Sequence, residues 1–226
     1  MAGLRRPAAA GHSRQAPGAI MKLALIVPLA LAAFIGAAQA EEGDDIREAS
    51  KAESEAFNAR MYAGKPGDKA YACFVRRYDA DHLARHPKQK VAAMKLLVSS
   101  ELDREDKELH HSFRLGFGYR HRSGNFDSSG SCNHAVFTRN GSEVRLGCGV
   151  DCDGGGIGVA LSKDDKAAIV RLERVRVWQN NKPDDEAEHA LVGGADDRIF
   201  RLDRTETSEC ASLVTDRKEL AALRSK

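Results

Sequence analysis

The five cysteines of this chain can form disulfides, which restrict the possible folds more than any other side chains do. They are Cys73, Cys132, Cys148, Cys152 and Cys210. An odd number of cysteines in an oxidising compartment favours disulfides and one spare thiol. The hairpin signal Asn140-Gly141 narrows the pairing. With a strict two-residue turn at Asn140-Gly141, Asn133 would lie opposite Cys148. If the length of the loop differs by one residue, Cys132 lies opposite Cys148 instead. The same register pairs Val136 with Val144.

We therefore expect a Cys132–Cys148 disulfide. A second disulfide, Cys73–Cys210, would tie the first strand of the main domain to the last. This scheme leaves Cys152 as the free thiol. A Cys148–Cys152 bridge across the small loop is the alternative pairing.

A metal site is the second chemistry that this loop suggests. Cys148 and Cys152 have the C-x(2–4)-C spacing of half a zinc ligand set. Asp151 and Asp153, followed by three glycines, also resemble the start of a calcium loop. The twelfth position of an EF-hand loop would then be Ser162, which is not a carboxylate. The alternative is a glycine-rich turn with exposed aspartates.

A histidine pair gives a second candidate metal site. His82 and His86 lie four residues apart, so a helical turn would place both rings on one face. A zinc protease helix would carry Glu after the first histidine, where this chain has Leu83, and Pro87 ends any helix at once. The alternative is a pair of surface histidines on a short turn. Four further histidines fall on or beside expected strands, and they are His110, His111, His121 and His134.

A short basic and aromatic segment is the candidate ligand-binding site, and it consists of Tyr119, Arg120, His121 and Arg122. It precedes a loop rich in Gly and Ser at residues 123–131. Positive charge beside an aromatic ring suits an anionic ligand or an acidic partner. The alternative is the solvated rim of a loop.

Catalytic motifs are not found in this sequence. It contains no G-x-S-x-G nucleophile elbow. Gly154 to Gly158 lacks the Lys and Ser/Thr of a phosphate-binding loop and leads into a strand. We therefore predict no catalytic residue and no cofactor, and no motif identifies a family. The expected function is an exported module that binds a small ligand or an envelope protein. The alternatives are a structural envelope component, or a metal-dependent protein or enzyme that uses His82/His86 or residues 148–153.

The elements that would position these residues are mainly strands. Apolar residues alternate with polar residues and glycines over residues 111–120, and the apolar set is Phe113, Leu115, Phe117 and Tyr119. Further strands are expected at residues 71–77, 91–99, 157–161, 169–178 and 198–202, and a hairpin of two strands is expected at residues 132–150. The alternation changes phase near Glu173, which predicts a β-bulge. Helices are expected at residues 44–61, on the surface of the domain or as a partly ordered arm, and at residues 213–223.

Seven or eight short strands joined by turns favour one antiparallel β-barrel or strongly curved meander, with short N- and C-terminal helices. A two-layer α+β fold is the alternative, because residues 79–98 also suit a helix. We divide the chain into residues 1–40 as an N-terminal extension and signal peptide, residues 41–67 as a helical arm or linker, and residues 68–226 as the β domain.

Residues 21–40 have the order of a secretory signal peptide: a positive start, an apolar run and an A-x-A site before Glu41. Cleavage between Ala40 and Glu41 predicts a periplasmic or secreted protein without a membrane span. Whether Met1 or Met21 is the true start stays open. Residues 1–40 hold four of the 35 basic residues and none of the 33 acidic ones, so the remainder has a net charge of −2. That balance argues against nucleic acid as a partner.

Overall fold

The computed structural model describes residues 46–64, 66–138, 141–151, 153–180, 182 and 189–224. Three features predicted from the sequence lie outside these residues, namely the signal peptide with its cleavage site, Asn140 of the hairpin turn, and Cys152. No helix within the described ranges is both long enough and apolar enough to cross a membrane.

Strands make up about half of the described residues, and a few short helices flank them. The strands are β1 (Ile46–Glu48), β2 (Lys69–Arg77), β3 (Val91–Leu102), β4 (Leu109–Tyr119), β5 (Phe126–Phe137), β6 (Glu143–Gly149), β7 (Gly155–Leu161), β8 (Ala167–Arg176), β9 (Trp178–Gln179), β10 (Ala190–Val192) and β11 (Ile199–Thr205). The helices are α1 (Lys51–Met61), α2 (Ala80–Arg85), the 3-10 helix η1 (Thr207–Leu213) and α3 (Arg217–Arg224).

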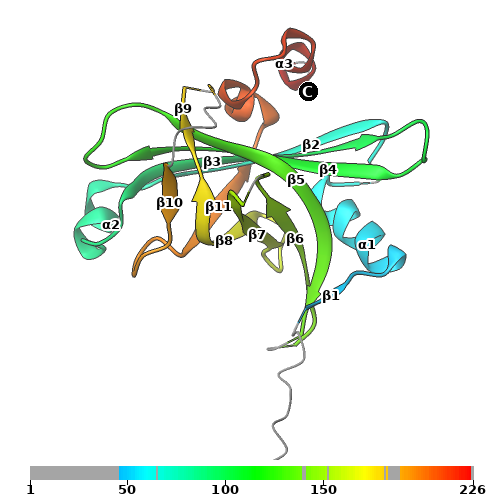
Figure 1. Cartoon of the computed structure of the whole chain (residues 1–226), viewed down its shortest axis with the longest axis horizontal. Helices are drawn as coiled ribbons and strands as arrows, with labels where there is room; N and C mark the ends of the chain where they lie inside the picture. Colours follow the sequence, from blue (N-terminus) through cyan, green and yellow to red (C-terminus); the bar gives the residue numbers. More distant parts are fainter. Residues whose placement is uncertain are drawn as a thin grey trace, which may run out of the picture. The chain divides into compact units, whose positions relative to one another are not determined.

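Eight of these strands close into an antiparallel barrel (Figure 1). Strands β2 to β8 pair in sequence order, and β11 lies between β8 and β2, which closes the ring. The predicted antiparallel meander barrel is therefore confirmed. The α+β alternative is not adopted, because residues 91–102 form a strand that pairs with β2 on one side and β4 on the other.

The strand register also follows the sequence pattern. In the β5–β6 hairpin Cys132 lies opposite Cys148 and Val136 opposite Val144, as the one-residue change in the loop predicts. Between β7 and β8 the pairing passes from Gly155↔Val175 to Ile157↔Leu172. Three steps on β8 oppose two on β7, so the extra residue of the predicted bulge lies at 173–174.

The barrel interior is filled by side chains. Alternate residues of each strand point inward, and Phe74, Leu96, Phe113, Leu115 and Leu146 are each at most 1% exposed. The predicted alternation on β4 places its apolar residues in this core. A barrel of eight strands has an interior just wide enough for side chains to fill, and here they form a packed core.

The N-terminal helix α1 contributes to this core. Its first turn carries a capping box between Ser50 and Glu53, and Arg47 forms a salt bridge with Glu53 at 2.6 Å. Phe57 and Met61 are 1% and 0% exposed and belong to the same cluster as the barrel interior. The helix begins later than the sequence predicts, because residues 46–48 pair with β5 as β1.

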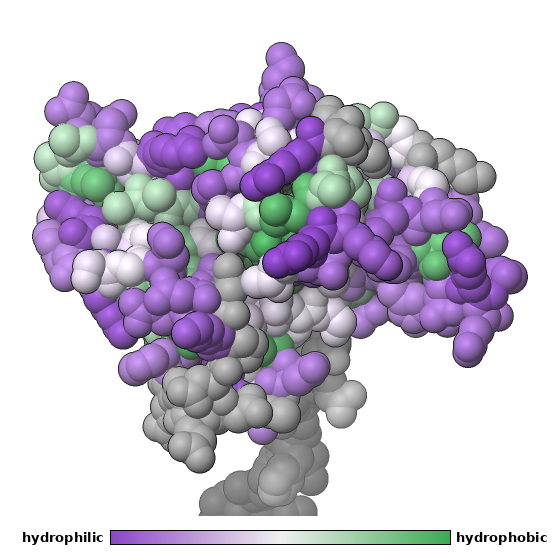
Figure 2. Space-filling model, turned by 90° about the horizontal axis from the view of Figure 1, so that it is seen from above, coloured by the Kyte–Doolittle hydropathy of each residue, from purple (hydrophilic) through white to green (hydrophobic). Residues whose placement is uncertain are grey.

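A second, smaller core lies on the outer face of β2 and β3. The C-terminal segment of η1 and α3 packs there, and the cluster consists of Tyr71, Cys73, Val75, Leu97, Cys210, Leu213, Val214 and Leu223. The Cys73–Cys210 disulfide joins the two sides across a sequence separation of 137 residues. Both disulfides favoured by the sequence are therefore present, since Cys132 and Cys148 are also bonded. The face seen from above carries small apolar patches separated by hydrophilic side chains (Figure 2).

Candidate functional site

A cleft at the α2 end of the barrel is lined by arginine, histidine, tyrosine and aspartate side chains, and it is the candidate functional site. It has a volume of about 490 Å³, and its lining includes Arg76, Tyr78, His82, His86, Gln89, Asp196, Arg198, Ile199 and Arg201. These residues come from the end of β2, from α2 and the loop after it, and from the start of β11. The antiparallel pairing of β2 with β11 brings the two halves together.

Three aromatic rings form a ladder along the cleft. The rings of Tyr78 and His82 are stacked at 4.5 Å, and those of His82 and His86 at 4.4 Å. The guanidinium carbon of Arg76 lies 5.6 Å from the centre of the Tyr78 ring. Burial raises the pKa of the Tyr78 hydroxyl, so this group stays neutral at physiological pH.

The neighbouring backbone and Gln89 fix the orientation of His82. Gln89 is 4% exposed, and its Nε2 donates to the carbonyl of Val91 at 2.7 Å. Its Oε1 can then only accept, so His82 donates from Nε2 to Gln89 at 3.0 Å. Asp79 caps α2 by accepting from the His82 backbone at 2.7 Å. Local structure thus holds the ladder in place.

Guanidinium groups dominate the charge of the cleft. Asp203 forms an ion pair with Arg76, with 2.9 Å between a guanidinium nitrogen and a carboxylate oxygen. Its other carboxylate oxygen lies 3.8 Å from Nε of Arg201. Asp196 accepts from the backbone of Lys88 at 3.1 Å. The Arg198 side chain makes no ion pair or hydrogen bond with any described residue and is exposed. The cleft therefore presents more positive than negative charge, with one guanidinium uncommitted.

The predicted ligand segment at residues 119–122 lies at the same end of the barrel. Arg120 donates to the carbonyls of Leu83 and His86 at 3.1 and 3.4 Å, where it holds the end of α2. Arg122 lies over the ring of Phe126 at 4.5 Å, and Tyr119 packs edge-on against the same ring. His121 is exposed. Arg120 thus supports the end of α2, while His121 and Arg122 are both exposed to solvent.

The predicted metal residues do not form one ligand set. The stacked rings of His82 and His86 face each other, whereas imidazole lone pairs lie in the ring plane, so the two nitrogens do not converge. Asp151 and Asp153 belong to the β6–β7 turn, where Arg174 donates to the carbonyl of Asp153 at 3.0 Å. Within the described residues, no group of three His, Cys, Asp or Glu ligand atoms contains any of these four.

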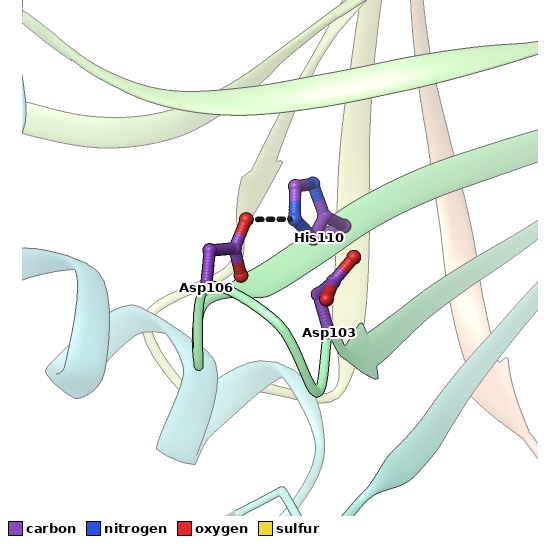
Figure 3. Close-up of side chains that lie close together, drawn as sticks. All are labelled: Asp103, Asp106 and His110. Atoms are coloured by element: carbon purple, nitrogen blue, oxygen red, sulfur yellow. Dashed lines mark hydrogen bonds and ion pairs between the residues drawn. The ribbon is translucent and has the colours of Figure 1, made fainter.

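A different group comes within ligand distance, in the turn between β3 and β4. The ligand atoms of Asp103, Asp106 and His110 all lie within 4.8 Å of one another, and the three side chains converge in Figure 3. His110 and Asp106 are 3.1 Å apart. Asp106 also accepts from the backbone of Glu108, and that bond is the main cause of its lowered pKa. The spacing matches no standard metal motif, so the sequence did not indicate it.

A buried polar cluster closes the opposite end of the barrel. Asn58 of α1 is 5% exposed, and its Oδ1 accepts from Nε2 of both His111 and His134 at 3.0 Å. The two imidazole rings are 4.7 Å apart and nearly perpendicular. Burial lowers the pKa of His111, and burial with repulsion from His111 lowers the pKa of His134 to about 4. Both rings are therefore neutral at pH 7.

Comparison with known protein families, with curated proteins and with solved structures finds no match to this chain. Its function is therefore argued from the geometry of its own residues.

Proposed function

We propose that this chain is an extracytoplasmic binding module that takes a small organic anion in the cleft at the α2 end of the barrel. The observation that carries the proposal is one cleft of about 490 Å³ that contains both a stacked aromatic ladder and three arginines. The arginines are Arg76 of β2, Arg201 of β11 and Arg198, which directly precedes β11. Ligand pockets typically combine a few well-placed polar groups with apolar and aromatic surface.

Arginine favours carboxylate and phosphate ligands. Its planar guanidinium donates in pairs to such groups, and it is weakly hydrated compared with the lysine ammonium. Arg198 supplies the uncommitted guanidinium, while Arg76 and Arg201 share Asp203. Ile199 lines the same cleft with 61% of its surface exposed and offers an apolar contact beside the charge. An anion with a hydrocarbon or aromatic portion suits this combination better than a bare inorganic ion.

The compartment is part of the same proposal. Two disulfides favour an oxidising environment, because the cytoplasm keeps most thiols reduced. Together with the signal-peptide pattern of residues 21–40, they support export and cleavage between Ala40 and Glu41.

Titration of the untagged protein, with residues 41–226, against benzoate, hexanoate and inorganic phosphate tests the proposal. Amide chemical shifts followed by NMR would locate any bound anion. We expect saturable binding of the organic acids, with the largest shifts around α2 and the start of β11. The affinity should fall as salt is raised, because the ions screen the charged groups.

A double variant, Arg198→Gln with Arg201→Gln, should abolish the saturable shifts. The matched control is Lys163→Gln, which removes an exposed cation from the β7–β8 turn, where no described residue pairs with it. Shifts that persist in the double variant, or that are lost equally in the control, would show that the cleft is not the anion site.

A further inference from the structure

The buried cluster of His111, His134 and Asn58 closes the end of the barrel that carries α1. His111 lies on β4 directly opposite Cys132 of β5, and His134 lies two residues further along the same face of β5. Both imidazole Nε2 atoms are 3.0 Å from the single Oδ1 of Asn58. Two strands and one helix thus direct three donor atoms toward one small region.

The surroundings hold both rings in place. Phe57 packs edge-on against His134 with ring centres 5.4 Å apart, and Tyr62 stacks on His111 at 6.3 Å. In the metal-free protein Nε2 of each neutral ring donates to Asn58, so metal binding through Nε2 requires each ring to carry its proton on Nδ1 instead.

Two buried hydroxyls beside the cluster lack partners of good hydrogen-bond geometry. Ser100 is 1% exposed and lies directly opposite His111 in the β3–β4 pairing. Its Oγ lies close enough to the buried Tyr62 hydroxyl to act on the pKa of that group, although neither oxygen has a partner of good hydrogen-bond geometry. Buried polar atoms are paired in the great majority of cases, and an exception often marks a bound water or ion.

The cluster can also be reached from solvent. A cavity of about 500 Å³ is lined by His111, His134 and Cys132 together with residues of β1 and α1. The cavity therefore borders both histidines of the cluster, while Asn58 lies outside its lining.

We propose that His111, His134 and the Asn58 side-chain oxygen form a binding site for one divalent transition-metal ion, of the zinc or copper class. Imidazole nitrogen is a preferred ligand of these ions. Their bonds to nitrogen and oxygen are about 2.0–2.2 Å, so two donors of a tetrahedral site lie about 3.3–3.6 Å apart. The present nitrogen–oxygen distances of 3.0 Å therefore need to lengthen by only a few tenths of an ångström. Three protein donors leave a fourth position open toward the cavity.

Metal-free protein, untagged and dialysed against a chelator, is the material for the test. It would be titrated with Zn²⁺ by calorimetry, with Co²⁺ by visible absorption and with Cu²⁺ by electron paramagnetic resonance. We expect one equivalent to bind, cobalt bands of a site with fewer than six ligands, and copper spectra with coupling to imidazole nitrogen. Thermal unfolding should shift upward with excess metal, because the ion binds the folded state.

Variants locate the ion. His111→Ala and His134→Ala should each weaken binding at least about tenfold, while His110→Ala in the exposed β3–β4 group and His82→Ala in the cleft should leave it unchanged. Asn58→Asp should bind more tightly, because a carboxylate replaces the neutral oxygen. Far-UV circular dichroism of each metal-free variant checks that the barrel is folded.

Three outcomes would overturn the proposal. The first is no stoichiometric binding to the wild-type protein, which needs no variant to interpret. The second is loss of binding in His110→Ala or His82→Ala, which would assign the ion to those groups. The third is a folded Asn58→Asp variant that binds no more tightly than wild type. The first and third outcomes do not bear on the anion cleft at the other end of the barrel.

Discussion

Replacing Phe57 with alanine tests whether α1 belongs to the barrel core. The sequence places this segment in an arm or linker, whereas the structure buries Phe57 to 1% exposure among the residues of the barrel interior. Removing a fully buried phenylalanine loses the transfer free energy of the ring and leaves a cavity, which together cost about 3–5 kcal/mol. The ring also packs edge-on against His134, so the cavity would border a polar group.

Urea denaturation followed by circular dichroism measures the free energy of unfolding of wild type and Phe57→Ala. In a thermal unfolding experiment on a domain of about 150–250 residues, each kcal/mol of lost stability lowers the melting temperature by about 2–4 °C. A fall of about 6–20 °C is therefore expected for Phe57→Ala. Glu55→Ala is the matched control, because Glu55 is exposed on the same helix and should change stability by less than about 0.5 kcal/mol. A loss below about 1 kcal/mol in Phe57→Ala would show that the helix is a detachable arm and refute the reasoning.

Two further predictions concern the disulfides and pH. Cys73→Ser with Cys210→Ser should lower the free energy of unfolding by about 2–5 kcal/mol, because the bond closes a loop of 137 residues in the unfolded chain; an oxidised double variant as stable as wild type would contradict this. Stability should also fall as pH drops from the ordinary histidine pKa of 6.5 toward about 4, because the unfolded chain binds a proton that folded His134 excludes until about pH 4. Urea denaturation across this window checks the slope. His134→Gln should reduce it, while His121→Gln, at an exposed position, should not.

Several structural features could be read directly from the sequence. Strict alternation along residues 111–120 predicted the inward face of β4, and the change of phase near Glu173 predicted the bulge between β7 and β8. The hairpin register, and with it the Cys132–Cys148 bond, followed from the positions of the two cysteines around Asn140-Gly141. These features depend on local spacing, because the side-chain period of a strand is two residues.

The candidate sites were much harder to predict. The cleft needs Arg76 and Tyr78 at the end of β2 beside Arg198 at the start of β11, which are more than a hundred residues apart in the chain. The sequence indicated His82 and His86 because they are four residues apart, but it did not indicate that their rings stack on Tyr78. Spacing shows which residues share a face, but not which neighbour covers that face.

The sequence alone determined the elements: a chain of short antiparallel strands, a hairpin register, a bulge and a pair of disulfides that fit them. Only the tertiary structure decided that β11 closes the ring against β2, that α1 enters the core, and that Asn58 lies between His111 and His134. The physical reason is the range of the interactions. Strand period and turn geometry act between near neighbours, whereas barrel closure and buried polar contacts join distant residues once the whole apolar surface is packed.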